Sequence, residues 1–123
     1  MRFGYTILYV RDVAASVEFY ERAFGLPRRL LHQSGQYAEL ETGATALAFA
    51  SHELAAESAG ELGRKEPAGF EICLVDEDVE AAYTHAVEAG GEPVSAPEEK
   101  PWGQHTACVR DPDGTLIEIA SPM

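Results

Sequence analysis

The chain contains one sequence pattern twice, and this repeat constrains its fold more than any other feature. Shifted by 66 residues, the segment that starts at Tyr5 aligns with the segment that starts at Glu71. The matches include Leu8 with Leu74, Asp12 with Asp78, Gly25 with Gly91 and Pro27 with Pro93. Further on, the offset becomes 68 and then 70, which pairs 35–37 with 103–105 and 48–51 with 118–121. A half-chain of about 50 to 60 residues buries little apolar surface, so the repeat predicts two similar modules in a pseudo-two-fold structure.

Length and composition predict one ordinary globular domain. The chain has 123 residues, 46% of them hydrophobic, which suits a single shared core and a single type of site. It has no run of 18 apolar residues and enters a strand pattern directly after Met1, so we expect a cytoplasmic protein without a signal peptide. Cys73 and Cys108 lie far apart in strand-like runs, which predicts buried, reduced thiols.

The net charge of −12, from 21 acidic and 9 basic residues, argues against nucleic acid as a partner. An acidic surface repels a phosphate backbone and raises the local concentration of cations. Two interpretations remain. The charge either keeps a soluble protein apart from its neighbours or favours a cationic ligand.

Hydrophobic spacing predicts a βαβββ order in the first half, at about 1–51. An apolar run at 3–10 predicts a strand, and Asp12 then caps a helix that Gly25 ends. The inward stripe of this helix consists of Val13, Val17, Tyr20 and Phe24. Three strands follow at 28–32, 36–41 and 45–50, separated by turns at Ser34-Gly35 and Thr42-Gly43.

The second half, at about 70–123, predicts the same order. A strand at 70–75 precedes a helix over 78–89 that Gly90-Gly91 ends, and further strands lie near 93–96, 104–110 and 115–120. The sequence Asp111-Pro112-Asp113-Gly114 is typical of a tight turn. Between the halves, 52–69 is rich in Ala, Glu and Gly, which favours a linker with a short helix around 52–61.

The order of these motifs resembles the vicinal oxygen chelate superfamily, which contains glyoxalases, bleomycin resistance proteins and ring-cleaving dioxygenases. The resemblance covers nearly the whole chain. It rests on Tyr5, Val10, Asp12-Val13, Ser16, Phe19-Tyr20 and Phe24-Gly25-Leu26, and on a second copy that ends in Asp111-Pro112-Asp113-Gly114 and Glu118. It implies an α+β fold in which two βαβββ modules form a cup-shaped mixed sheet. It also implies a homodimer.

The resemblance also implies four metal-ligand positions, which fall on Tyr5, Ala48, Glu71 and Glu118. Glu118 suits its position, and Glu71 is a carboxylate where an imidazole is commoner. Alanine cannot bind a metal, and the phenol of Tyr5 must lose a proton with an ordinary pKa of about 10. Glu71 and Glu118 could still hold a hard divalent cation together with waters, at reduced affinity.

Strand alternation predicts what else lines the cup. If Tyr5 points inward, Ile7 and Tyr9 do as well, and the neighbouring strand contributes Ala48 between two further alanines. Trp102 either seals a core edge or joins an aromatic wall, and His105, paired with Tyr37 by the repeat, is either a sheet histidine or part of the lining. The predicted ligand-binding residues are Tyr5, Ile7, Tyr9, Tyr37, Ala48, Glu71, Trp102, His105 and Glu118.

Three functions fit these residues. The favoured one is a metal-independent small-molecule-binding protein, similar to antibiotic-sequestering members of the superfamily, with an aromatic or cationic ligand. The alternative is a glyoxalase-like or dioxygenase-like lyase or isomerase with a divalent metal ion on Glu71 and Glu118. A metal-free enzyme that uses these two carboxylates as acid and base is the third. No catalytic residue is assigned.

Overall fold

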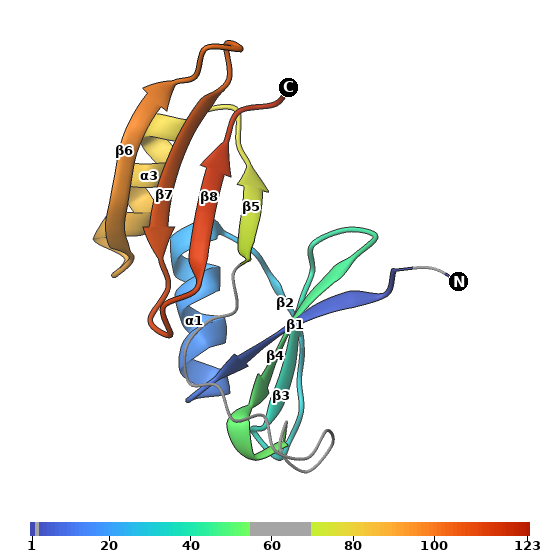
Figure 1. Ribbon diagram of the computed structural model, residues 1–123. Helices are drawn as coiled ribbons and strands as arrows, with labels where there is room; N and C mark the ends of the chain where they lie inside the picture. Colours follow the sequence, from blue (N-terminus) through green and yellow to red (C-terminus); the bar gives the residue numbers. More distant parts are fainter. Residues whose placement is uncertain (2, 55–69) are drawn as a thin grey trace. The chain divides into compact units, whose positions relative to one another are not determined.

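The computed structural model of the protein describes residues 1, 3–54 and 70–123 (Figure 1). The chain divides into two compact units, Met1–Arg64 and Lys65–Met123. Each unit packs a helix against a four-stranded mixed sheet. The predicted α+β fold and the βαβββ order of both halves are confirmed.

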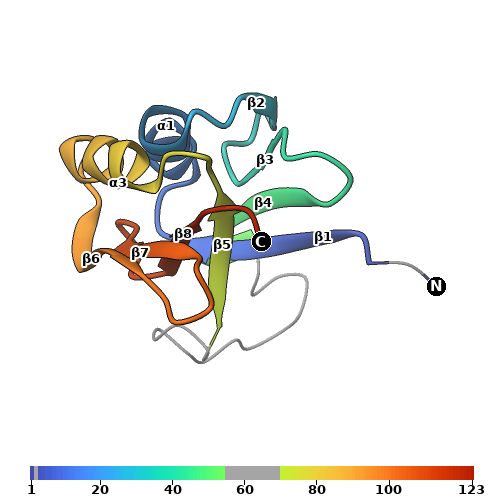
Figure 2. The same cartoon turned by 90° about the horizontal axis from the view of Figure 1, so that it is seen from above.

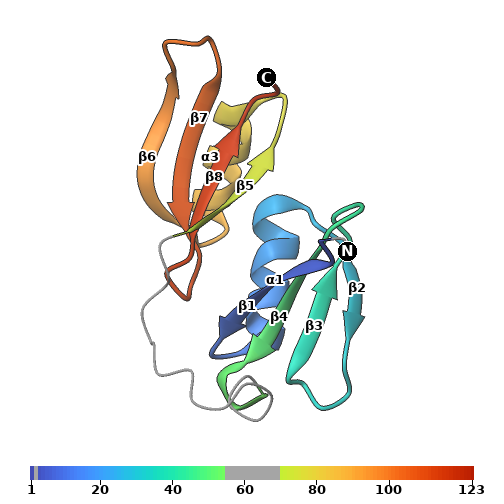
Figure 3. The same cartoon turned by 45° about the vertical axis from the view of Figure 1, so that its right-hand side comes forward.

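Unit 1 consists of β1 (Tyr5–Val10), α1 (Val13–Phe24), β2 (Arg28–Leu31), β3 (Tyr37–Leu40) and β4 (Ala46–Ser51). Its sheet has the strand order β1-β4-β3-β2, in which β1 and β4 are parallel and the other neighbours are antiparallel. Figure 3 shows α1 behind this sheet. The first and last strands of unit 1, β1 and β4, are therefore hydrogen-bonded to each other.

Helix α1 begins and ends where the sequence predicts. The Asp12 carboxylate accepts a hydrogen bond from the Ala15 N–H at 3.0 Å, and Gly25 ends the helix in the left-handed region at φ 65°. Of the predicted stripe, Val13, Val17 and Tyr20 are buried but Phe24 is only half-buried, and Ser16, Phe19 and Ala23 are buried as well. The Tyr20 ring lies 4.8 Å from that of Phe49, centroid to centroid, which fixes the side of β4 that faces the helix.

Unit 2 consists of β5 (Glu71–Val75), α3 (Val79–Glu88), β6 (Glu92–Glu99), β7 (His105–Arg110) and β8 (Leu116–Ala120). Its strand order is β5-β8-β7-β6, with β5 parallel to β8. Figure 2 shows α3 along one face of this sheet. Strand β6 is longer than predicted because irregular pairing with β7, shifted near Pro93 and Ser95, extends it to Glu99.

The turn at 111–114 forms as predicted and is closed by a buried carboxylate. Asp111 Oδ1 accepts hydrogen bonds from the Asp113 N–H at 2.9 Å and the Thr115 N–H at 2.8 Å. Gly114 takes a φ of 87°, and Arg110 donates to its carbonyl. The side chain of Asp111 thus replaces water as the partner of two backbone donors.

The predicted linker falls largely outside the described residues. Residues 52–54 are helical, and Ser51 Oγ accepts a hydrogen bond from the Leu54 N–H at 3.1 Å. The rest of the predicted helix around 52–61 and of the linker lies in 55–69, which the structure does not describe. Within the described ranges, no helix is long and apolar enough to cross a membrane.

The structure corrects the predicted repeat alignment in one strand. Ser51 N–H donates to the Gln36 carbonyl, whereas Ser121 N–H donates to the His105 carbonyl, both at 2.9 Å. The counterpart of Tyr37 is therefore Thr106, since these residues lie opposite Ala50 and Ala120 in their sheets. The predicted pairing of Tyr37 with His105 is wrong by one residue: both strands start directly after a Gly-Gln pair, but the first residue of β3 lies opposite Ala50, whereas the second residue of β7 lies opposite Ala120.

Candidate functional site

In unit 1, the sheet face opposite α1 carries five of the nine side chains predicted to bind a ligand. We call it the helix-free face of unit 1, formed by alternate residues of β1, β3 and β4. Leu8 and Val10 of β1 are buried, whereas Tyr5, Ile7 and Tyr9 are 55%, 38% and 45% exposed. This alternation confirms the predicted phase of β1. Three large side chains thus leave apolar surface open along one strand.

Cross-strand register arranges this face in rows. Ile7 of β1 lies opposite Ala48 of β4, which lies opposite Glu39 of β3. In the next row, Ala50 lies between Tyr9 and Tyr37. The middle position of each row is a single methyl group, so the flanking side chains of β1 and β3 stand above β4.

A hydrogen-bonded tyrosine and glutamate occupy the β3 side of this face. The Tyr37 hydroxyl donates to Glu39 Oε2 at 2.9 Å, and Glu39 Oε1 lies 3.9 Å from Arg29 Nε. Partial burial, the hydrogen bond to Glu39, and the charges of Glu39 and Tyr5 raise the pKa of Tyr37 to about 12. The phenol therefore stays protonated at neutral pH and keeps donating its hydrogen bond to the carboxylate.

Glu39 is not among the residues predicted to bind a ligand. The signal was available in the spacing, because Tyr37 and Glu39 are two residues apart on a strand and so share a face. The same alternation that placed Ile7 and Tyr9 beside Tyr5 identifies Glu39 once β3 is known to border β4.

Unit 2 presents the equivalent helix-free face, on which two thiols flank a carboxylate. Cys73 of β5 and Cys108 of β7 both lie opposite Glu118 of β8. The Cys73 thiol donates a hydrogen bond to Glu118 Oε1 at 3.5 Å. The prediction that both thiols are buried is wrong for Cys73, which is exposed, because its strand is at the sheet edge; Cys108 is half-buried.

The environment of Cys73 keeps its thiol protonated. Partial burial, the hydrogen bond to Glu118, and the charges of Glu118 and Glu71 raise the pKa of Cys73 to about 11. Partial burial and the same two carboxylates also raise the pKa of Cys108. Both cysteines are therefore poor nucleophiles at neutral pH.

We expect Cys73 to be alkylated slowly by iodoacetamide at neutral pH, with a rate that rises as the pH approaches 11. Glu118→Gln should speed the reaction at pH 8 severalfold, since removal of the nearby negative charge lowers the thiol pKa. Mass spectrometry in a Cys108→Ser background measures the rate at Cys73 alone. A rate in wild type equal to that of an unfolded peptide would contradict the assignment.

Glu71 and Glu118 share this face, as predicted. Glu71 lies opposite Leu116, two residues before Glu118 on the adjacent parallel strand. Both carboxylates act on Cys73, which lies opposite Glu118 and two residues after Glu71. Unit 2 therefore holds an acidic patch, whereas the corresponding positions of unit 1 carry Tyr5 and Ala48.

Comparison with known proteins identifies the family of this double βαβββ chain. A family model described as the Glyoxalase/Bleomycin resistance protein/Dioxygenase superfamily matches residues 2–119. The chain belongs to this superfamily. It is 36% identical over 117 residues to the uncharacterized protein YraH of Bacillus subtilis (strain 168), with 91% of each chain covered.

Solved structures support the same superfamily fold. A glyoxalase-related enzyme from Fulvimarina pelagi matches with a TM-score of 0.89 and 22% identity, over 99% of this chain and 88% of that one. A glyoxalase/bleomycin resistance protein/dioxygenase family enzyme from Burkholderia phytofirmans PsJN matches with a TM-score of 0.89 and 23% identity, over the whole of both chains. At these identities the likeness shows the fold and not a shared activity.

The donors within either unit do not fit the metal centre that membership of the superfamily implies. Among residues 1, 3–54 and 70–123, no group of three or more His, Cys, Asp or Glu side chains is arranged to hold a metal ion. Glu71 and Glu118 are the only two of the four inherited positions with a carboxylate. The nearby Cys73 donates a hydrogen bond to Glu118 and stays a neutral thiol, which is a poor metal ligand.

Trp102 and His105 do not lie among the side chains of the helix-free face of unit 2. His105 alternates with Ala107 and Val109, and Val109 borders Gly91 at the end of α3, so His105 falls on the helix-side phase of β7. Trp102 is 65% exposed in the turn before β7 and donates to Gln104 Oε1 at 3.0 Å. It therefore does not seal a core edge, and a role in binding stays a prediction for both residues.

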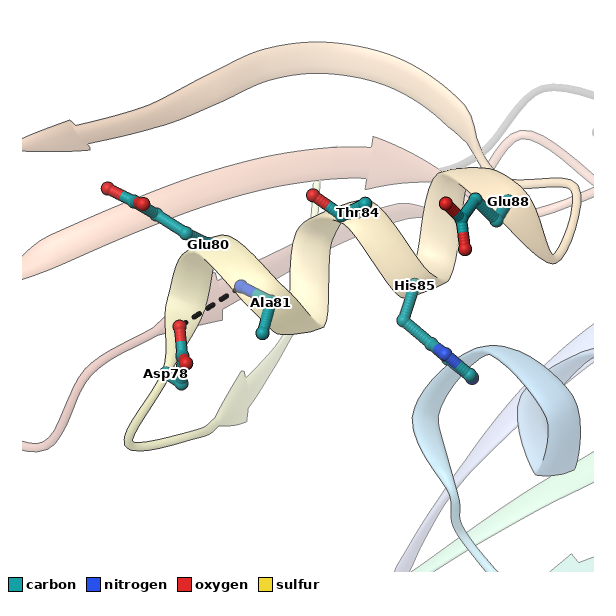
Figure 4. A pocket seen from close by; sticks show the side chains of 6 residues that line it. All are labelled: Asp78, Glu80, Ala81, Thr84, His85 and Glu88. Atoms are coloured by element: carbon teal, nitrogen blue, oxygen red, sulfur yellow. Dashed lines mark hydrogen bonds between the residues drawn. The ribbon is translucent and has the colours of Figure 1, made fainter.

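A shallow hollow on the outer side of α3 offers no alternative site for superfamily chemistry. It is lined by Asp78, Glu80, Ala81, Thr84, His85 and Glu88. Figure 4 shows that these side chains diverge along the helix and that Asp78 is occupied as the helix cap, hydrogen-bonded to the Ala81 N–H. Groups that do not converge on a point cannot jointly hold a ligand.

Proposed function

We propose that the protein is a metal-independent small-molecule-binding protein, similar to the antibiotic-sequestering members of its superfamily. The helix-free face of unit 1 carries the proposal, because Tyr5, Ile7 and Tyr9 are exposed along β1. Exposed aromatic side chains offer a flat ligand a surface on which to stack. Tyr5 stands at one of the positions where the resemblance to metal-dependent members implies a ligand.

Charge supports an aromatic ligand with a positive group. The protein has a net charge of −12, and both helix-free faces carry carboxylates, Glu39 in unit 1 and Glu71 and Glu118 in unit 2. A cation over an aromatic ring gains further attraction from the ring's negative face. We also propose that the protein acts in the cytoplasm as a homodimer, with Trp102 among its ligand contacts.

Isothermal titration calorimetry tests this function with two probes of different shape. Metal-free bleomycin is a bulky basic glycopeptide, and proflavine is a flat aromatic cation at neutral pH. We expect saturable binding of at least one probe, and Tyr9→Ala should weaken it by about tenfold because it removes stacking area. Phe3→Ala, which truncates a 72% exposed ring outside the strand, is the matched control.

Two results would contradict the proposal. The absence of heat and of any Trp102 fluorescence change with both probes would rule out this ligand class. Equal weakening by Tyr9→Ala and Phe3→Ala would place the ligand elsewhere than on the β1 face.

A metal-dependent lyase or isomerase is the second candidate, because Glu71 and Glu118 share one sheet face. We expect protein purified without chelator to contain far less than one divalent ion per chain, since two carboxylates alone bind weakly. Inductively coupled plasma mass spectrometry measures the content. Stoichiometric metal that disappears in Glu118→Ala, but persists in Glu92→Ala, would favour the enzyme over the binding protein.

A further inference from the structure

We propose that Glu39 selects cationic ligands, pairing its carboxylate with the ammonium or amidinium group of an aromatic molecule that lies on the helix-free face of unit 1. This inference rests on the proposed binding function. It adds the charge of the ligand and the residue that recognises this charge. The sequence repeat and the metal positions that the resemblance implies do not single out Glu39, although the repeat includes Tyr37 of the same strand.

The position of Glu39 is set by the sheet. Glu39 lies opposite Ala48, and Ala48 lies opposite Ile7, so the carboxylate and the exposed apolar side chain of β1 are two strand spacings apart. Neighbouring strands are about 4.8 Å apart, which puts the two flanks of this row about 10 Å from each other. Ala48 itself is buried between these flanks, so a flat molecule would rest on the exposed β1 side chains and present its positive end to Glu39.

The carboxylate of Glu39 is held on one oxygen and weakly paired on the other. Its Oε2 accepts a hydrogen bond from the Tyr37 hydroxyl at 2.9 Å, while its Oε1 lies 3.9 Å from Arg29 Nε, beyond hydrogen-bond distance. The Arg29 side chain is 53% exposed, and its Nε lies equally far from Glu41. The solvated guanidinium of Arg29 thus forms ion pairs with both Glu39 and Glu41, and such surface ion pairs are weak.

Burial distinguishes the two carboxylates near Arg29. The side chain of Glu39 is 20% exposed, whereas that of Glu41 is 55% exposed. Interactions between charges are stronger where water screens them less, so a ligand cation gains more from Glu39 than from Glu41. Glu41 therefore provides a matched comparison, because it has the same charge and lies near the same arginine but is more exposed to solvent.

Tyr37 is a positioning residue for Glu39. Because its pKa is raised to about 12, the phenol is a hydrogen-bond donor throughout the neutral range. Its bond to Oε2 fixes the carboxylate and directs Oε1 away from the tyrosine. Tyr37→Phe removes this bond without removing the charge, so it should weaken binding of a cation less than Glu39→Gln does.

The experiment compares proflavine with acridine, its uncharged parent ring system at pH 7.5, by titration calorimetry on the full chain. We expect wild type to bind proflavine more tightly than acridine. Glu39→Gln should lower proflavine affinity by about tenfold or more, because a hydrogen-bonded charge pair is lost. Acridine affinity should stay unchanged. Glu41→Gln should alter either affinity less than about twofold, and Tyr37→Phe should weaken only proflavine.

The outcomes separate this inference from the function on which it rests. If wild type binds proflavine and Glu39→Gln binds it equally well, the role of Glu39 is overturned and the binding function stands. Equal affinity of wild type for acridine and proflavine overturns the inference in the same way. If wild type binds neither probe, the proposed function for this ligand class fails and the inference fails with it. Circular dichroism spectra and thermal midpoints confirm that the isosteric Glu39→Gln chain is folded.

Discussion

Phe49→Ala is expected to lower the free energy of unfolding by about 3 to 5 kcal/mol. Phe49 is fully buried in β4, and its ring packs against Tyr20 of α1 with 4.8 Å between centroids. In the sheet it lies between Leu8 and Ala38, both buried. Truncation therefore leaves a cavity on the helix side of the sheet, at the point where α1 and three strands meet.

Urea denaturation followed by far-ultraviolet circular dichroism measures this loss, and Phe3→Ala is the control. Phe3 is the same residue type but 72% exposed, so its truncation should change the unfolding free energy by less than about 0.5 kcal/mol. Similar values for the two variants would mean that Phe49 does not occupy the core of unit 1. A Phe49→Leu chain, which refills most of the volume, should recover much of the loss.

Asp111→Ala is expected to destabilise the protein by about 3 kcal/mol. The buried carboxylate accepts hydrogen bonds from the backbone N–H groups of Asp113 and Thr115, at 2.9 and 2.8 Å. Each buried donor left without a partner costs about 1 to 3 kcal/mol. The turn between β7 and β8 would lose the group that closes it.

The controls for Asp111 separate burial from the turn itself. Asp76 also accepts a backbone hydrogen bond, from the Asp78 N–H at 2.8 Å, but it is exposed, so Asp76→Ala should cost about 1 kcal/mol or less. Asp111→Asn keeps an acceptor oxygen, so its loss of stability should be smaller than that of Asp111→Ala and larger than that of Asp76→Ala. Differential scanning calorimetry reports the midpoints, and an Asp111→Ala midpoint equal to that of Asp76→Ala would refute the buried role.

Local sequence signals predicted the elements of both units because the physics behind them is local. Asp12 and Asp78 cap helices with their own side chains, Gly25 adopts the conformation that side chains disfavour, and the 111–114 turn closes on its own aspartate. Alternation placed Leu8 and Phe49 on the helix side for the same reason. Such interactions span a few residues and need no knowledge of the rest of the chain.

The features that the sequence could not predict depend on which strands are neighbours and on which residues lie opposite each other in the sheet. The identical Gly-Gln pairs before β3 and β7 suggested one alignment, but the ladder makes Thr106, not His105, the counterpart of Tyr37. The exposure of Cys73 follows from the edge position of β5, which no single strand reveals. Register and strand order are tertiary properties, so residues that depend on them are found only in the folded sheet.

For the same reason, only part of the candidate site could be predicted from the sequence. The open β1 residues followed from alternation, and the loss of metal donors followed from the identity of Ala48. Glu39 was missed although Tyr37 of the same strand was predicted, because none of the metal-ligand positions that the resemblance implies lies on β3. Alternation puts Glu39 on the same face as Tyr37, but only the pairing of β3 with β4 brings it opposite Ala48.

The strand order of each unit also determines which strand edges could pair with another chain. The edge strands β2 and β6 disfavour such pairing. Strand β2 carries the charges of Arg28 and Arg29, and β6 carries Pro93 and Pro97, which have no N–H to donate to another strand. The opposite edge of unit 1, β1, has neither proline nor charge. Strand β1 is synthesised before its neighbour β4, which begins at Ala46. The growing chain therefore carries an unpaired apolar strand until β4 has been made, and crowding on polysomes is the condition under which aggregation should begin.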